Sequence, residues 1–198
     1  MVNANGCGSY TNTVRAINSC GPGCTITPAP TVTLNATQTS CDTYTATAFT
    51  SPAPVSHSWE IGQDASFSGS PTATNANVVY SHAGQHVIIY NATYPLPGGG
   101  LCTVQRYVTK IIPFIPEIKY DVVCSATPGM WDIIIKDFSE YYPGAPADTK
   151  TFTVNGNNYP VPVGQMTHTV TVPGGTYNLG IVLTKAGYQT CTFNISNP

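Results

Sequence analysis

The sequence is poor in charged residues. Asp, Glu, Lys and Arg make up 8% of its 198 residues, against about 25% in an ordinary soluble domain. The net charge is −2, and the seven lysines and arginines are scattered, so they form no basic patch of the kind that binds nucleic acid. Runs of about 18 or more apolar residues are also absent, which excludes a spanning helix. We therefore expect no nucleic-acid partner and no membrane insertion.

Recognisable catalytic and metal-binding motifs are missing as well. The chain contains no G-x-S-x-G elbow, no H-E-x-x-H pair and no phosphate-binding glycine loop followed by a helix. His82 and His86 have the spacing of two metal ligands on a helix, but their segment leads into a strand, where that spacing does not bring both side chains to one ion. We expect no catalysis, no metal and no cofactor.

Threonine, glycine and proline are abundant instead, with 28, 18 and 17 copies. Segments of alternating polar and apolar residues lie between prolines, glycines and serines, which is typical of β-strands. We expect strands at 31–37, 43–49, 55–61, 77–81, 85–93, 103–112, 118–123, 131–138, 149–154, 168–172, 177–184 and 191–196. Turn signals recur about every 8 to 12 residues, which favours an all-β sandwich. The Asn-Gly pair within 155–158 predicts a hairpin turn.

Three stretches of the chain repeat one pattern. Each has a glycine, an alternating segment, a glycine-bearing turn and a Cys-Thr pair, and they span 8–24, 84–102 and 175–191. Proline-rich stretches at 27–31 and 111–117 separate them. We expect a terminal hairpin at 1–27 that belongs to a truncated or complemented module, a sandwich at 28–114 and a second sandwich at 115–198.

Two segments of the first sandwich resemble a known family. SHSWEIGQDAS (56–66) resembles the Trp-Asp-Phe-Gly-Asp-Gly strand and turn of polycystic-kidney-disease (PKD) domains, and VVYSHAGQHVIIYNAT (78–93) is similar to their Tyr-x-x-x-Gly-x-Tyr-x-Val-x-Leu segment. SCDTYTATAF and GLCTV resemble cysteine-bearing immunoglobulin-like repeats in surface proteins of gliding and adhesive bacteria. The resemblance covers 28–114, and 115–198 by position only. The resemblance implies tandem immunoglobulin-like sandwiches. It implies no calcium site, because Gln63 interrupts the motif at the place of the family's acidic turn, where this sequence has Asp64.

The seven cysteines indicate disulfides in an oxidising compartment, either secreted or at the cell surface. Position within each module favours pairing Cys41 with Cys102 and Cys124 with Cys191. The alternative is Cys41 with Cys191, because the intramodule partners fall at opposite poles of a plain immunoglobulin order. We also expect Cys20 and Cys24 to close a hairpin tip, which leaves Cys7 unpaired or intermolecular. Alternatively, Cys24 bonds to a distant cysteine, because it occupies the same place in the repeat as Cys102 and Cys191.

Other residues are candidates for the core, for ligand contact or for modification. Trp59 and Trp131 are expected in the core. Phe138, Tyr141 and Tyr142 form either a ligand surface or a loop that covers the end of the sandwich. Asn35, Asn91 and Asn194 each begin an N-x-[ST] sequon, which carries a glycan only in a cell with the glycosylation machinery.

These features favour a structural or adhesive module of an extracellular stalk or filament, without catalysis. Its partners would be neighbouring modules or other copies of the chain, and a glycan or cell-surface ligand. Residues 1–27 would be either the remnant of an upstream module or a strand donor to another copy. The alternative function is a glycan- or protein-binding accessory module of a secreted hydrolase.

Overall fold

The computed structural model describes residues 16–18, 26 and 28–196. Every regular element in this part of the chain is a β-strand, and the strands pair antiparallel, so the all-β prediction is confirmed. None of the described residues forms a helix with the length and apolar character that a membrane crossing requires. The chain divides into two compact units.

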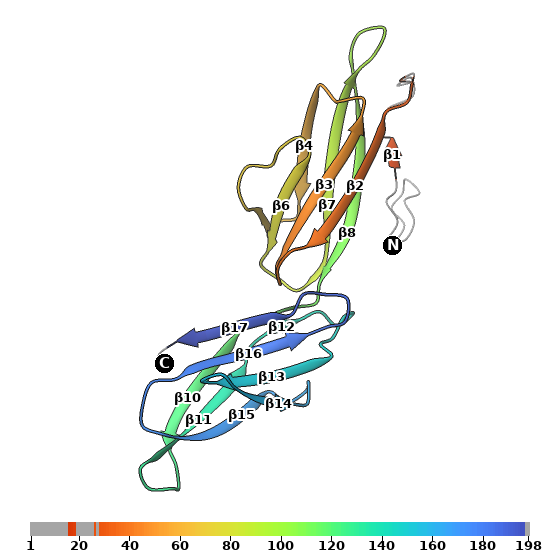
Figure 1. Ribbon diagram of the computed structural model, residues 1–198. Helices are drawn as coiled ribbons and strands as arrows, with labels where there is room; N and C mark the ends of the chain where they lie inside the picture. The colour runs from red at the N-terminus through yellow and green to blue at the C-terminus, as the bar shows by residue number, and fades with distance from the viewer. Residues whose placement is uncertain (1–15, 19–25, 27, 197–198) are drawn as a thin grey trace. The chain divides into compact units, whose positions relative to one another are not determined.

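The first unit contains two antiparallel sheets, with the strand orders β1-β8-β7-β4 and β2-β3-β6-β5 (Figure 1). Its strands are β1 (Ala16–Asn18), β2 (Thr31–Gln38), β3 (Thr43–Ser51), β4 (Ser56–Ile61), β5 (Ala65–Phe67), β6 (Asn75–Tyr80), β7 (Gly84–Pro95) and β8 (Leu101–Ile112). Val32 and Leu34 of β2 are buried, whereas Thr33 and Asn35 between and after them are exposed. This alternation places one face of the strand in the core and the other in solvent.

Contacts across the first unit show that its two sheets face each other. Arg106 Nε of β8 donates to the carbonyl oxygen of Val32 in β2 at 3.0 Å. Trp59 of β4 packs against Tyr90, its neighbour on β7 in the same sheet, with ring centroids 4.6 Å apart. Its indole N–H donates at 2.9 Å to the carbonyl oxygen of Thr72, in the connection between β5 and β6 of the other sheet. Trp59 is 8% exposed, so its predicted place in the core is confirmed.

Strand β1 pairs with β8 of its own chain. Residues Ala16, Ile17 and Asn18 lie opposite Arg106, Gln105 and Val104. Most of the hairpin predicted at 1–27 lies outside the described residues, as do Cys7, Cys20 and Cys24. The described part of this segment therefore extends a sheet of the first unit.

The second unit also contains two larger sheets, ordered β10-β11-β15 and β14-β13-β16-β17. Its strands are β9 (Phe114–Ile115), β10 (Ile118–Cys124), β11 (Met130–Asp137), β12 (Glu140–Tyr141), β13 (Thr149–Val154), β14 (Asn157–Val161), β15 (Thr167–Pro173), β16 (Asn178–Thr184) and β17 (Cys191–Ser196). The short strands β9 and β12 pair with each other. Ile135 from one sheet and Phe152 and Ile181 from the other belong to one buried cluster, so the sheets pack face to face.

The predicted Asn-Gly turn joins β13 to β14. Asn155 and Gly156 have φ angles of 47° and 79°, the left-handed values that a two-residue hairpin turn requires. Pro160 lies in β14, which is an edge strand of its sheet, and an edge is where a strand tolerates a residue without an N–H.

The second unit is discontinuous in sequence. It comprises not only residues from 111 onward but also Gln38–Asp42, which connect β2 to β3, and Ser81–Gly84, which connect β6 to β7. Gln38 Oε1 accepts a hydrogen bond from the backbone N–H of Gln189 at 3.1 Å, and Cys41 Sγ lies 3.5 Å from the carbonyl oxygen of Thr190. Residues from the first part of the chain thereby contact the turn before β17.

The structure corrects the predicted disulfide pairing. Cys41 bonds to Cys191, which was the alternative, with Cα atoms 5.2 Å apart. Cys102 is also disulfide-bonded, and Cys124 is a free, exposed thiol. The pairing of Cys41 with Cys102 and of Cys124 with Cys191 is therefore wrong. The reason is topological, because the two cysteines lie at opposite ends of the sandwich. Cys124 lies opposite Trp131 near the start of β11, whereas Cys191 lies in register with Lys150, whose side chain meets Asp137 at the other end of β11.

Candidate functional site

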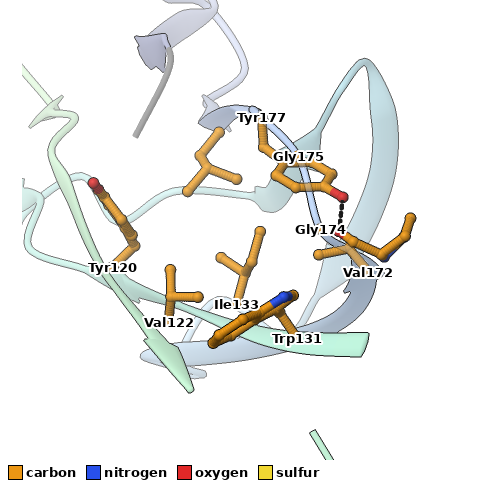
Figure 2. Close-up of a pocket in the computed structure, with 10 residues that line it drawn as sticks. Tyr120, Val122, Trp131, Ile133, Val172, Gly174, Gly175 and Tyr177 are labelled. Carbon is orange, nitrogen blue, oxygen red and sulfur yellow. Dashed lines mark hydrogen bonds between the residues drawn. The ribbon is translucent and has the colours of Figure 1, made fainter. Parts of the chain in front are cut away.

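A pocket of about 270 Å³ opens in the second unit. Figure 2 shows the rings of Tyr120, Trp131 and Tyr177 around the aliphatic side chains of Val122 and Ile133. None of the residues that line it is charged. Its volume is close to the lower end of the range of about 300–1,000 Å³ that is usual for ligand sites. An apolar or ring-shaped group therefore suits this pocket better than an ion does.

The pocket lies at the end of β11 where the inward-facing side chains become more exposed to solvent. Ile135, Ile133 and Trp131 alternate with outward-facing residues and so point to the same side of the strand. Their exposed fractions are 0%, 2% and 42%. Trp131 thus occupies an inward-facing position beyond the well-covered part of the sheet. The prediction that it is a core residue is wrong for this reason.

The two strands that pair with β11 place further apolar side chains beside Trp131 and Ile133. Val122 of β10 lies opposite Ile133 and is half-exposed, and Val172 of β15 lies opposite Trp131. Sequence reasoning missed this site. The signal was present in the alternation of 118–124, whose inward-facing positions include Tyr120 and Val122, but alternation alone does not show where the facing sheet ends.

The loop between β15 and β16 forms the rim of the pocket. The hydroxyl of Tyr177 donates to the carbonyl oxygen of Pro173, a bond drawn as a dashed line in Figure 2. A Cβ atom on Gly174 would lie 3.6 Å from Nε1 of Trp131. A larger side chain at 174 would therefore add atoms beside the indole nitrogen, so glycine keeps this edge of the ring accessible.

The free thiol of Cys124 lies beside the pocket. Cys124 is directly opposite Trp131 in the β10–β11 pairing, so both side chains lie on the same face of the sheet. Cys124 and Trp131 are both exposed. A reagent attached to this thiol would consequently reach the indole ring.

The structure does not bring the predicted aromatic surface together. Phe138 is exposed, with Lys119 Nζ 4.2 Å from its ring centroid. Tyr141 instead directs its hydroxyl inward, where it donates to Asp137 Oδ2 at 2.5 Å. Tyr142 lies against Gly144, where a Cβ atom would be only 2.6 Å from the tyrosine ring. Tyr141 is therefore part of an internal cluster and not of an exposed aromatic face.

That internal cluster contains a buried ion pair. Lys150 Nζ lies 2.6 Å from Asp137 Oδ2, and both side chains are 0% exposed. Burial on its own would raise the pKa of Asp137, but hydrogen bonds from Lys150, Ser139 and Tyr141 outweigh it, so the pKa is lowered and the carboxylate is ionised. Burial and the adjacent carboxylate raise the pKa of Tyr141, which keeps its hydroxyl protonated.

The two histidines with the spacing of metal ligands face different carboxylates. His82 Nδ1 lies 3.0 Å from Glu140 Oε2, and His86 Nδ1 lies 3.0 Å from Asp64 Oδ2. His86 also stacks on Tyr80, with ring centroids 4.1 Å apart. No group of three or more His, Cys, Asp or Glu side chains within 16–18, 26 and 28–196 is arranged to hold a metal ion.

The three sequons differ in accessibility. Asn35 in β2 and Asn194 in β17 are exposed. Asn91 is 9% exposed, and its amide donates to Glu60 Oε1 at 2.6 Å and accepts from Gln105 Nε2 at 2.9 Å. Because a glycan on Asn91 would replace these hydrogen bonds on a buried side chain, the folded chain does not accommodate it there.

No protein-family model matches the chain, and no curated protein matches it significantly.

Proposed function

We propose that the chain is a structural and adhesive part of an extracellular protein, built from tandem immunoglobulin-like, PKD-like sandwiches and without catalytic activity. The disulfide between Cys41 and Cys191 carries this proposal. Disulfides persist in secreted and surface proteins and are rare in reducing compartments. The two β-units and the low charge of the chain also suit a stalk segment.

The adhesive part of the proposal rests on the pocket around Trp131. Exposed tryptophan and tyrosine rings provide much of the binding energy at protein interfaces, because they offer a large apolar area together with a polar group. Trp131 supplies the ring and indole N–H, while Ile133 and Leu179 form a buried apolar floor. We propose that the pocket receives an apolar side chain of a protein on an opposing surface.

The extracellular assignment is tested in cells that make the protein. Intact cells are treated with a protease and, separately, with a membrane-impermeant thiol reagent before and after reduction. Peptides of this chain should be released from intact cells, and Cys41 and Cys191 should react only after reduction. Release only after lysis, with both cysteines already reduced, would show that the assignment is wrong.

Adhesion is tested by coating a surface with the protein and measuring the attachment of cells or of extracellular proteins. Trp131→Ala should reduce attachment, whereas Phe138→Ala removes a similarly exposed ring outside the pocket (49% against 42%) and serves as the matched control. Equal attachment by both variants would reject the pocket as the adhesive site.

The alternative function is a glycan-binding accessory module, and the same pocket now provides the observation that favours it. Tryptophan and tyrosine rings are also suitable for stacking against sugar rings. Binding to a glycan array that is lost in Trp131→Ala and kept in Phe138→Ala would support this alternative over a protein ligand.

A further inference from the structure

The buried ion pair joins the two facing sheets of the second unit. Asp137 is the last residue of β11, in the sheet β10-β11-β15. Lys150 is the second residue of β13, in the sheet β14-β13-β16-β17. Their side chains meet in the interior, with Nζ and Oδ2 2.6 Å apart.

Neighbouring groups hold both side chains in place. The backbone N–H of Ser139 donates to Asp137 Oδ1 at 2.8 Å, and the hydroxyl of Tyr141 donates to Oδ2 at 2.5 Å. Lys150 Nζ also donates to the carbonyl oxygen of Gln165 at 2.8 Å. The nitrogen and the carboxyl group are therefore oriented toward each other by contacts on both sides.

From this geometry we propose that Lys150 and Asp137 condense to an intramolecular amide, an isopeptide bond that cross-links the two sheets. The ammonium first gives a proton to the carboxylate, which leaves a neutral amine and a carboxylic acid. The amine nitrogen then attacks Cγ of Asp137, the Nζ–Cγ bond forms, and the Cγ–Oδ2 bond breaks. One hydrogen stays on the amide nitrogen, and two leave with the departing oxygen as water, so no further reactant is needed.

Burial on its own disfavours both charges, which reduces the cost of forming the neutral amine and acid, while the hydrogen bonds to Asp137 keep its carboxylate ionised in the resting ion pair. Groups that a fold holds in reactive contact behave as if present at effective concentrations on the order of 10⁵–10⁸ M. The water that forms leaves a site in which both side chains are 0% exposed, which opposes the reverse hydrolysis.

Tyr141 is the group placed to move the protons. Its hydroxyl touches Oδ2, the atom that departs as water, and its ring centroid lies 5.5 Å from Lys150 Nζ. The hydroxyl can donate its proton to the departing oxygen and recover one from the attacking nitrogen. Burial and the adjacent Asp137 raise the pKa of this hydroxyl, so it carries its proton before the reaction.

The chain contains a matched pair that should not react. Lys185 Nζ lies 2.8 Å from Asp148 Oδ1, but their side chains are 24% and 44% exposed. Water solvates both charges there, so the neutral amine and acid are not favoured. The same two residue types thus provide an internal control for the effect of burial.

Mass spectrometry of the full chain tests the proposal. After complete reduction and alkylation, the protein should be lighter by one water molecule than the mass calculated for its sequence with all seven cysteines alkylated. Trypsin cuts after Lys136 and Lys185 but not after an amide-linked Lys150, so it should release a single peptide, 137–185, that lacks one water. Unmodified peptides 137–150 and 151–185 in full yield, with the mass of the intact sequence, would overturn the proposal.

Two variants locate the bond and its catalyst. Lys150→Arg keeps the positive charge but should have the full mass of its sequence, and loss of water in this variant would place the cross-link elsewhere and overturn the assignment. Tyr141→Phe keeps the ring and should slow formation of the cross-linked peptide by about 100-fold or more, the usual contribution of general acid–base catalysis. Unchanged formation in Tyr141→Phe, measured in freshly made protein, would remove Tyr141 from the reaction.

Discussion

Cys41 and Cys191 are separated by 150 positions in the sequence, and a disulfide brings their Cα atoms to 5.2 Å. This distance is within the range of about 4.4–6.8 Å that disulfides adopt. The bond encloses most of the described chain in one covalent loop. In the chain-entropy model, a long loop gives a disulfide its largest effect on the unfolded state.

Removing this disulfide should destabilise the protein. We expect the double variant Cys41→Ala, Cys191→Ala to lower the free energy of unfolding by about 2–4 kcal/mol, measured by urea denaturation. Cys124→Ala is the matched control, because Cys124 is free and exposed, and it should leave the midpoint unchanged. Equal midpoints for the double variant and the wild type would contradict a stabilising role for the bond.

Modifying Cys124 should report on Trp131. The two residues are directly opposite in the β10–β11 pairing, so a nitroxide attached to the thiol should quench the emission of Trp131. Trp59 is the other tryptophan of the chain, so labelled and unlabelled Trp131→Phe measure its contribution to the emission. The part of the quenching that is lost in Trp131→Phe is the part that belongs to Trp131. Emission that is insensitive to labelling in the wild type would argue against the observed register.

Two buried tyrosines should respond in opposite ways to loss of the hydroxyl. The hydroxyl of Tyr80 is buried and has no hydrogen-bond partner among the described residues, whereas that of Tyr90 donates to the carbonyl oxygen of Ala73 at 2.9 Å. An unsatisfied buried polar group is destabilising, so Tyr80→Phe should raise the free energy of unfolding by about 1 kcal/mol. Tyr90→Phe should lower it by about 0.5–1.5 kcal/mol. Thermal or urea unfolding distinguishes the two, and destabilisation by Tyr80→Phe would reveal a partner for its hydroxyl.

Glycosylation should be selective if the chain passes through a glycosylating secretory pathway. We expect glycans on Asn35 and Asn194, which are exposed, and none on Asn91, which is buried and hydrogen-bonded. Peptide mapping of protein secreted from such a host, before and after enzymatic removal of glycans, measures the occupancy of each site. A glycan on Asn91 in correctly folded protein would contradict the observed packing of β7.

Acid should weaken one surface contact of the second unit. The hydrogen bond from Lys185, together with one from the backbone N–H of Ala186, lowers the pKa of Asp148. A carboxyl group whose pKa is lower in the folded state stabilises the fold above its unfolded pKa of about 3.9, and this stabilisation is lost as the pH falls through the folded value.

Asp148→Asn should therefore show a smaller loss of stability than the wild type between about pH 5 and pH 2, in urea unfolding at each pH. Lys185→Met removes the main cause of the shift and should have a similar effect. Parallel stability curves for Asp148→Asn and the wild type would show that this contact does not contribute.

Much of the fold was predictable because alternation is a local property. The predicted strands at 149–154 and 191–196 coincide with β13 and β17, and the Asn155-Gly156 turn was identified from the dipeptide. Strand β14 was missed because Pro160 interrupts its pattern, and only its place at the edge of a sheet makes that proline acceptable.

The site was less predictable because it depends on how strands from distant parts of the chain cover one another. The alternation in 131–138 placed Trp131 on the inward face correctly, but it could not show that the residue is 42% exposed at the end of that face. In the same way, cysteine spacing within each module could not show that Cys41 belongs with the second unit. Asp137 and Lys150 are of ordinary residue types for a surface, and nothing in their spacing indicated that both would be buried.

The discontinuity of the second unit has a consequence for how such a protein can be duplicated or recombined. A gene segment that encodes only residues 111–198 would omit Gln38–Asp42 and, with them, the cysteine to which Cys191 is bonded. Copying that segment into another protein would give a sandwich with an unpaired, buried cysteine. A gene segment that encodes an intact second unit must therefore also encode the strands of the first unit. The pair of sandwiches is the smallest segment that recombination can transfer without losing the Cys41–Cys191 disulfide.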